Sequence, residues 1–359
     1  MSCGIIGLPQ VGKTSLFQIL TGKTPEGSHG HGETQHIGVV PVPDDRLDRM
    51  SKLFSPPRTI YARVEYVDVA AISKDTLKET GYLGSLRNMD ALAHVVRVFR
   101  DDSVAHAKGS IDPKRDIESV ELDLILADLG IIENRLERLE KDRKKAKTPE
   151  LEREQILLEK ARQCLETEKP LREADWDEEE KRRLRGFTFL SAKPMLIVLN
   201  VGEEEVTAMD DVLPQLGLDN LRSRPNTLAT AVSAKIEAEL AMMSDSEAGE
   251  FLKSYGLRES GRTRMLRATL DLLGYIVFLT VGEDECRAWT IPRGATAVQA
   301  AGAIHSDLAK HFIRAEVVAW DQLLEAGSFA AARQKGVLRL EGKEYVVQDG
   351  EIVHIRHSG

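Results

Sequence analysis

The segment from Gly7 to Thr14, Gly-Leu-Pro-Gln-Val-Gly-Lys-Thr, has the residue types and spacing of a phosphate-binding loop. Glycine lets the backbone approach phosphate oxygens, and the N–H groups of the loop and of the following helix bind anions. In such a loop Lys13 reaches the β- and γ-phosphates, where it is also a catalytic candidate, and the Thr14 hydroxyl coordinates Mg²⁺. The residues predicted to hold the nucleotide here are Gln10, Val11, Gly12, Lys13, Thr14 and Ser15.

Asp68 is the candidate for a second group at the metal. It lies near the end of the stretch 60–69, which partly alternates between apolar and polar residues and so predicts a strand. An Asp at this place in enzymes with a phosphate-binding loop holds the Mg²⁺ shell. A strand-end Asp on its own is usually a helix cap or a turn residue. Because Asp68 accompanies a predicted phosphate-binding loop, we expect it to hold Mg²⁺ as the cofactor.

Two later turns are candidates for contact with the base. The first follows the apolar run 195–199, where guanine-specific proteins carry Asn-Lys-x-Asp; here the lysine is missing and the acid is a glutamate. These changes weaken the case for guanine, and the asparagine can pair with N6 and N7 of adenine. The second turn follows an apolar stretch that ends at Val232. The alternative for the first is an ordinary strand-to-helix turn. The predicted contacts are Asn200, Val201, Glu203, Ser233, Ala234 and Lys235.

Composition excludes several classes of protein. The 359 residues carry a net charge of −9, so the chain as a whole is not a non-specific polyanion binder. Its three cysteines are far apart, which argues against a disulfide framework and a zinc site. No apolar run approaches the roughly 20 residues of a membrane span, and no secretion signal is visible. We expect a cytoplasmic monomer that binds neither DNA nor membranes.

The elements that must position these residues fall into three groups. Strand and helix patterns alternate over 1–100 and again over 193–272, which is typical of an α/β protein with a parallel sheet. Residues 112–185 are highly charged, with apolar residues spaced as in a coiled coil and a break at Thr148-Pro149, so we predict an antiparallel helical hairpin. Residues 275–359 predict a small α+β domain, with strands near 276–281, 286–291, 337–340, 344–347 and 352–356.

These motifs, in this order, resemble the YchF branch of the Obg-like family of P-loop nucleoside triphosphatases. The resemblance covers nearly the whole chain. The parts that carry it are residues 4–17, 38–44, 112–118, 200–203, 287–290, 294–302, 304–307, 312–317 and 340–350. The C-terminal part is similar to a TGS domain, a ubiquitin-like β-grasp module. The implied fold is therefore a P-loop domain, Rossmann-like, formed by 1–100 and 193–272, with a helical coiled-coil insertion at 101–192 and a TGS domain at 275–359.

The resemblance also implies an activity. The family hydrolyses ATP slowly, usually in preference to GTP, and associates with ribosomes or ribosomal RNA. It has an apolar residue where related enzymes carry the glutamine that positions water, and Ile72 stands at that place here. A histidine at the start of the helical insertion has a role in hydrolysis, and by its position in the motif this residue is His106. From the residues alone, His106 is a surface-loop histidine.

Three departures from the family bear on activity. Gln10 replaces the loop asparagine that helps to hold a monovalent cation, which puts potassium stimulation in doubt. Ala71 replaces the glycine whose N–H contacts the γ-phosphate, and alanine does not freely adopt a positive φ. The first switch is altered too: Thr34 is the candidate for the second hydroxyl at Mg²⁺, although it is out of register. His29, His31 and His36 suggest a metal site, which the glycine-rich loop without cysteine argues against.

Two functions follow. The first is a slow ATPase that acts on the ribosome, favoured by the intact loop with Asp68, Asn200 and Glu203. The alternative is a scaffold that binds nucleotide, hydrolyses it poorly and associates with the ribosome or RNA. It is favoured by Ala71, by Gln10 and by the segment 73–84, which is shorter than the glycine-rich segment that follows Ala71's position in the family. A GTP-preferring enzyme with a different partner is a third reading.

Overall fold

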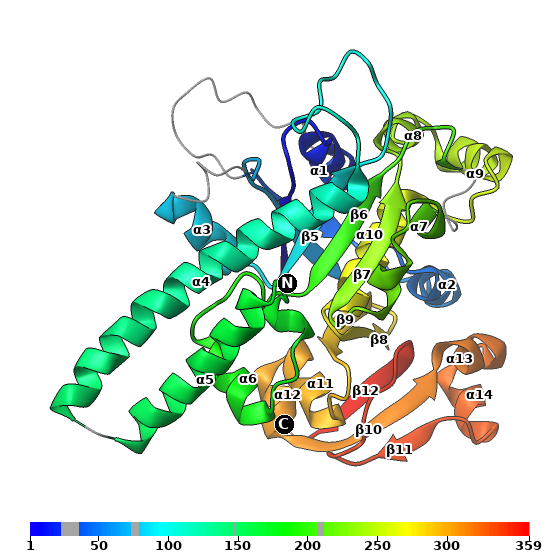
Figure 1. Ribbon diagram of the computed structural model, residues 1–359. Helices are drawn as coiled ribbons and strands as arrows, with labels where there is room; N and C mark the ends of the chain where they lie inside the picture. Colours follow the sequence, from blue (N-terminus) through cyan, green and yellow to red (C-terminus); the bar gives the residue numbers. More distant parts are fainter. Residues whose placement is uncertain (23–35, 73–78, 147, 207–211, 359) are drawn as a thin grey trace. The chain divides into compact units, whose positions relative to one another are not determined.

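The computed structural model describes residues 1–22, 36–72, 79–146, 148–206 and 212–358 (Figure 1). The chain forms two compact units. The first contains residues 1–39 and 65–272, and the second contains 40–64 and 273–359. In the described ranges no helix combines the length and the hydropathy that a membrane span requires.

A six-stranded sheet is the centre of the first unit. Its order is β2 (His36–Pro41), β4 (Arg63–Asp68), β1 (Ser2–Ile6), β5 (Ala91–Arg97), β6 (Met195–Asn200) and β7 (Thr227–Val232). Strands β4, β1, β5, β6 and β7 are parallel. Every residue of β5 and β6 is buried, which is why both read as continuous apolar runs. Because parallel strands share one carboxyl edge, the loops after β1, β4, β5, β6 and β7 meet there.

Helices cover this sheet. Helix α10 packs on β6 and β7, and α4 packs on β5. The helices of the first unit are α1 (Lys13–Thr21), α3 (Thr80–Arg87), α4 (Pro113–Lys145), α5 (Pro149–Glu166), α6 (Glu178–Arg185), α7 (Val212–Gln215), α8 (Ala234–Leu240), α9 (Asp245–Ser254) and α10 (Gly261–Leu272), with 3₁₀ turns η2 (Leu171–Glu173) and η4 (Asp219–Ser223).

The predicted helical hairpin is confirmed. Helices α4 and α5 pack against each other (Figure 1). The Thr148 side chain accepts from Leu151 N–H and Pro149 occupies the first turn of α5, so this pair ends one helix and starts the next. Where these helices meet, Ile125, Ile132 and Leu139 of α4 are buried. Leu122 continues the same apolar spacing toward the start of α4 but is 39% exposed, so the buried seam begins at Ile125.

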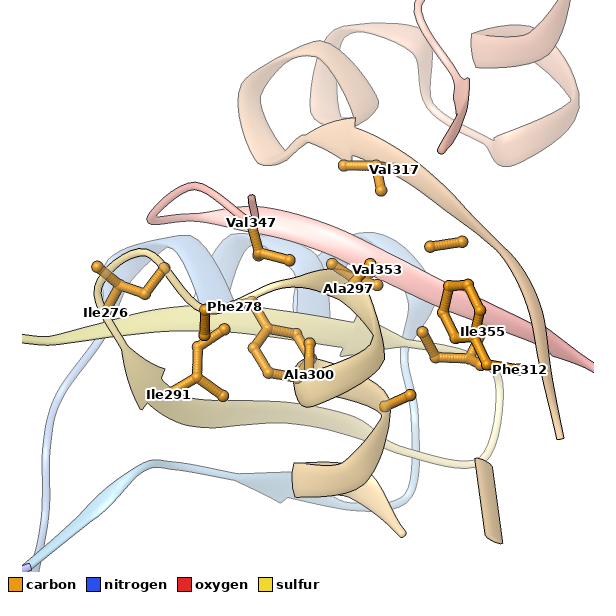
Figure 2. Close-up of a cluster of buried hydrophobic side chains, with 13 residues drawn as sticks. Ile276, Phe278, Ile291, Ala297, Ala300, Phe312, Val317, Val347, Val353 and Ile355 are labelled. Carbon is orange, nitrogen blue, oxygen red and sulfur yellow. The ribbon is translucent and has the colours of Figure 1, made fainter. Parts of the chain in front are cut away.

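The second unit contains a second six-stranded sheet. Its order is β11 (Arg339–Glu341), β10 (Phe312–Ala319), β12 (Glu351–His357), β8 (Tyr275–Val281), β9 (Cys286–Pro292) and β3 (Thr59–Ile60). Its helices are α2 (Asp45–Phe54), α11 (Ala297–Ile304), α12 (Ser306–Lys310), α13 (Trp320–Ala326) and α14 (Phe329–Gln334). Figure 2 shows its core, where Ala297 and Ala300 of α11 lie among Phe278, Ile291 and Val353 of the sheet.

Several expectations about this unit need correction. Residues 344–347 form no strand; Val346 makes only an isolated bridge to Thr296. Strand β10 was not anticipated, because its exposed Ile313 and Arg314 interrupt the alternation. The contact pattern also divides the chain differently from the predicted domains. Residues 40–64 were expected in the nucleotide-binding domain, whereas α2 and β3 pack with β8 and β9 of the second unit.

Candidate active site

The predicted phosphate-binding loop lies between β1 and α1. Gly7 has φ 148° and Gly12 has φ 93°, both in the region that favours glycine. A Cβ at Gly7 would collide with the Val95 carbonyl, and one at Gly12 with the Asn200 amide nitrogen. Both glycines are therefore required by shape as well as by conformation. Gln10 also has a positive φ, of 60°, which is unusual for a residue with a side chain.

Lys13, Thr14 and Asp68 come together beside this loop. The Lys13 ammonium donates to the Leu8 carbonyl oxygen at 2.9 Å. Burial lowers the pKa of Lys13 to about 8, and the nearby Asp68 opposes this shift. The Thr14 hydroxyl donates to Asp68 Oδ2 at 3.2 Å. Burial raises the pKa of Asp68, against the lowering effects of Thr14, Lys13 and His36.

The donor set suits a Mg²⁺ ion. Asp68 is 8% exposed, and its Oδ1 is buried without a hydrogen-bond partner among the described residues. A buried carboxylate oxygen without a donor is costly unless a cation meets it. Hydroxyl and carboxylate oxygens are the ligands that Mg²⁺ prefers. Thr14 and Asp68 therefore fit the ion.

Asn200 joins the phosphate-binding loop to the turn after β7. Its Nδ2 donates to the Val11 carbonyl at 3.0 Å, and its Oδ1 accepts from Ala234 N–H at 3.2 Å. Both ends of the amide are thus engaged by the backbone. The expectation that Asn200 reads N6 and N7 of adenine is not supported by this geometry, since the side chain braces two loops instead.

Glu203 and Lys235 form an ion pair at the same edge of the sheet. Lys235 Nζ lies 2.8 Å from Glu203 Oε2. The Lys235 side chain is 70% exposed and the Glu203 side chain 35%, so the pair is open to solvent. Val201 is buried, and its N–H donates to the Val232 carbonyl. Ser233 is also buried, and its Oγ has no hydrogen-bond partner among the described residues.

His106 lies in the segment between β5 and α4. The buried Arg97, at the end of β5, holds the start of this segment by donating to the carbonyls of Phe99, Asp101 and Val104 at 2.9–3.2 Å. Its guanidinium also lies over the Phe99 ring, 4.4 Å from the centroid. The segment is therefore tied to the sheet edge that carries Asn200.

Both ring nitrogens of His106 face protein groups. Nδ1 accepts from Lys108 N–H at 3.1 Å, so the ring proton of the neutral form is on Nε2. Nε2 lies 3.0 Å from Asp116 Oδ2, but off the line of a good hydrogen bond, and neither atom has another partner in the described ranges. Arg115 donates to the other oxygen of Asp116 at 3.0 and 2.8 Å. The His106 side chain is 6% exposed.

The segment after Asp68 is built without the expected glycine. Ala71 is not among the residues with positive φ, so the backbone avoids the conformation that alanine disfavours. Ile72 N–H donates to the Gly7 carbonyl at 3.0 Å, and its side chain is 1% exposed. Tyr82 of α3 donates to the Ala70 carbonyl at 3.1 Å. Ile72 therefore anchors the segment beneath the loop.

Some predicted site residues cannot be placed. Thr34, His29 and His31 lie outside the described residues. His36 is described, with its ring centroid 6.4 Å from that of Phe17. Among the described residues no three His, Cys, Asp or Glu side chains are grouped as metal ligands.

Sequence reasoning missed Arg97 and Asp116. Arg97 ends an apolar run. The neighbouring sequence does not show whether its guanidinium is exposed or is buried and donates to three backbone carbonyls. Asp116 is the fourth residue after the helix cap Asp112, a place where acidic residues simply favour the helix dipole. Only the fold brings it to His106.

Two family models match the chain. One, described as a 50S ribosome-binding GTPase, matches residues 2–135. The other, the YchF GTPase C-terminal domain, described as a protein of unknown function, matches residues 275–358.

Similar proteins match over almost their full length. The "Ribosome-binding ATPase YchF" of Bacillus subtilis is 40% identical, over 100% of this chain and 99% of the relative. The protein of the same name from Escherichia coli O157:H7 is 37% identical, over 98% of each. The solved structure of the Schizosaccharomyces pombe YchF GTPase superposes with a TM-score of 0.83 at 29% identity, over 99% of this chain and 97% of that one.

Proposed function

Because the chain belongs to the YchF family of P-loop nucleoside triphosphatases, we propose that it is a Mg²⁺-dependent enzyme that hydrolyses ATP slowly, in preference to GTP, in association with ribosomes. The observation that carries this proposal is the meeting of Lys13, Thr14 and Asp68 at one loop, braced by Asn200.

Thr14 and Asp68 would hold the Mg²⁺ ion. A bound ion would offset the negative charge that develops on the phosphate during transfer. Lys13 places its ammonium at the same oxygens, and the glycine-shaped loop turns its N–H groups toward them. The loop residues Gln10 to Ser15 thus bind the triphosphate.

The pair of Glu203 and Lys235 supports a preference for adenine. Guanine presents two donors, N1–H and the exocyclic amine, which together bind both oxygens of one carboxylate. Lys235 already occupies Oε2 of Glu203, so one oxygen remains without competition. Adenine presents a single amine and suits that arrangement. Ser233 and Ala234 then serve as neighbours of the base.

His106 is proposed as the catalytic group that orients the attacking water. In the described conformation its Nδ1 lone pair is used by Lys108 N–H and its Nε2 faces Asp116. A base needs a free lone pair toward the water it activates. His106 therefore has to leave its contacts with Lys108 and Asp116 before it acts. Ile72 is buried and apolar, so it cannot position the water instead. Slow hydrolysis without a partner follows.

The named activities of relatives suggest the partner. Several are "Ribosome-binding ATPase YchF" proteins, and ribosome binding by this chain would place it in the cytoplasm. The engaged His106 and the altered switch also favour the second candidate, a nucleotide-binding scaffold on the ribosome that hydrolyses little. Neither function requires an oligomer.

An equilibrium titration tests the nucleotide part. Fluorescent analogues of ATP and GTP are added to the protein with Mg²⁺, and to the variants Lys13→Ala and Lys235→Ala. We expect ATP to bind more tightly than GTP, Lys13→Ala to lose both, and Lys235→Ala to narrow the difference because both oxygens of Glu203 become available. Tighter binding of GTP by the unmodified protein would overturn the adenine preference.

A further inference from the structure

A second pocket lies at the base of the helical hairpin, with a volume of about 490 Å³. Its wall includes Pro194 and Asn226, which immediately precede β6 and β7. The phosphate-binding loop follows the carboxyl end of β1, and these strands are parallel. The pocket therefore opens at the edge of the sheet opposite to the candidate active site, and it is a separate place on the molecule.

The floor of this pocket is apolar and preformed. It consists of Leu171, Trp176, Leu184 and Phe189, each at most 7% exposed and all members of the hairpin core. The Trp176 indole N–H donates to the Leu171 carbonyl at 2.7 Å, which fixes the ring and satisfies its polar edge. A planar or aliphatic body can lie on such a floor without leaving a polar group unpaired.

The charged residues of the wall are all basic. They are Arg172, Lys181, Arg185 and Lys193, and none of the described residues that line the pocket is acidic. Arg172 is fully engaged: it donates to Thr227, to the Ser191 carbonyl and to Glu121. It thus shapes the wall and adds little free charge.

Two of the other cations are open to an anion. Lys193 Nζ donates to the carbonyls of Arg87 and Met89, and no carboxylate of the described chain lies within ion-pair distance of it. The exposed Arg185 guanidinium has neither a hydrogen bond nor an ion pair in the described ranges. Lys181 pairs only with Glu178 on its own exposed helix face, a contact worth little in water.

From this combination we propose that the pocket binds a nucleoside phosphate, either a free nucleotide or one nucleotide of an RNA strand. Arg185 and Lys193 meet the phosphate, since a guanidinium fork and an ammonium are the side chains that recognise it. The base lies on the apolar floor. Asn226 donates through Nδ2 to the Arg172 carbonyl, and its Oδ1 accepts from an amine of the base. A simple inorganic anion would leave the floor uncovered.

The pocket joins two parts of the first unit. Trp176 and Leu184 belong to the base of the hairpin, and Pro194 and Asn226 to the sheet edge. A bound nucleotide contacts both, so it stiffens the hairpin against the sheet. The rigidity of the hairpin relative to the sheet then depends on a ligand that binds away from the phosphate-binding loop.

The test uses the full chain carrying Lys13→Ala, which removes phosphate binding at the first site. AMP and a 5′-phosphorylated RNA trinucleotide are titrated separately while tryptophan fluorescence and heat are followed. Trp176 lies in the pocket, whereas Trp289 and Trp320 belong to the second unit. We expect saturable binding that changes the fluorescence, and in Trp176→Phe the heat should remain while the fluorescence change disappears.

A matched pair of charge reversals gives the decisive comparison. Arg185→Glu reverses a lining charge, and Arg182→Glu reverses an exposed charge on the same helix that does not line the pocket. We expect at least a tenfold loss of affinity in the first and a change below twofold in the second. Binding of both probes supports a free nucleotide as the ligand, and binding of the trinucleotide alone supports RNA. Equal losses in the two variants, or no binding of either probe at millimolar concentration, would overturn the proposal.

Discussion

Lys13 meets two opposing demands. Its ammonium must be charged to hold a triphosphate, yet 92% of its surface is removed from water. Burial is the larger effect and lowers its pKa to about 8, while Asp68 partly restores it. The free protein therefore begins to lose this proton just above neutral pH. A bound triphosphate favours the charged form, so binding takes up a proton when the pH exceeds that value.

Nucleotide affinity should consequently fall as the pH rises. Between pH 7.5 and 9, the linkage for a pKa near 8 weakens binding by about eightfold. The effect of Lys13 on folding stability has the opposite sign. Its pKa is about 8 in the folded protein and 10.5 in the unfolded chain, so between these pH values the unfolded chain holds more protons at this residue. The free energy of unfolding therefore rises with pH in this window. The dissociation constant of an ATP analogue at several pH values measures the effect. Lys13→Arg, which does not titrate, serves as control and should show a flat profile.

The contact between His106 and Asp116 restrains the proposed catalytic side chain. Replacing Asp116 with Ala removes a poorly aligned contact, which we take at the low end for a hydrogen bond, about 0.5 kcal/mol. If release of His106 limits hydrolysis, the basal rate of phosphate release from ATP should rise about twofold, with the KM unchanged.

Two controls accompany this variant. Asp112→Ala removes the cap of α4 and should leave the rate unaltered, because it weakens the same helix start without touching His106. The double variant His106→Ala, Asp116→Ala should lose the gain. A rate that falls in Asp116→Ala would mean that Asp116 supports His106 during the reaction and does not restrain it.

Asn200 marks the limit of prediction at this scale. The loop, Lys13, Thr14 and Asp68 could be identified from residue types and order, because phosphate chemistry demands them. Asn200 was predicted to contact the base, and its contacts with Val11 and Ala234 were not foreseen. A motif names a residue but not the partners of its two amide atoms.

At the level of elements, buried carboxylates fix the base of the hairpin. Asp128 of α4 is fully buried and accepts from the N–H groups of Leu190 and Ser191 at 3.0 and 2.7 Å. Glu121, two turns earlier, pairs with Arg172. These contacts tie α4 to the segment that returns the chain to β6. Periodicity predicted the helices, because a seam repeats, but single anchoring acids carry no periodic signal.

Asp128→Ala should therefore destabilise the first unit by about 2–4 kcal/mol, since two buried N–H groups lose their acceptor. Glu137→Ala, an exposed substitution on the same helix, should change the free energy of unfolding by less than about 0.5 kcal/mol. Urea unfolding followed by Trp176 fluorescence measures both. Equal effects of the two substitutions would show that Asp128 is not an anchor.

For the whole molecule, the division of the chain is the main feature that local patterns did not reveal. Residues 40–64 fall within the stretch 1–100, which was predicted as one part of the α/β domain. The structure gives α2 and β3 to the second unit, where α2 packs on β8, β9 and α13. Thr59 of β3 pairs with Cys286 of β9, although the two residues are far apart in the sequence. Tertiary packing decides which strands pair, and the strand propensity of a segment does not predict its partner.

Met50 of α2 is fully buried, so Met50→Ala should destabilise the second unit by about 2–5 kcal/mol. The matched control is Met242→Ala, because Met242 is 91% exposed. In a Trp176→Phe background the remaining Trp289 and Trp320 both report on the second unit. A shift of their unfolding transition in Met50→Ala alone is expected. An unshifted transition would mean that α2 does not belong to that unit's core.

The most direct measurement is phosphate release from ATP and from GTP by the unmodified protein, with and without Mg²⁺ and ribosomes, beside His106→Ala. We predict release that requires Mg²⁺, is faster from ATP than from GTP, is accelerated by ribosomes and is lost in His106→Ala. Bound nucleotide with no phosphate under any of these conditions would contradict the enzymatic account and identify the protein as a nucleotide-binding scaffold.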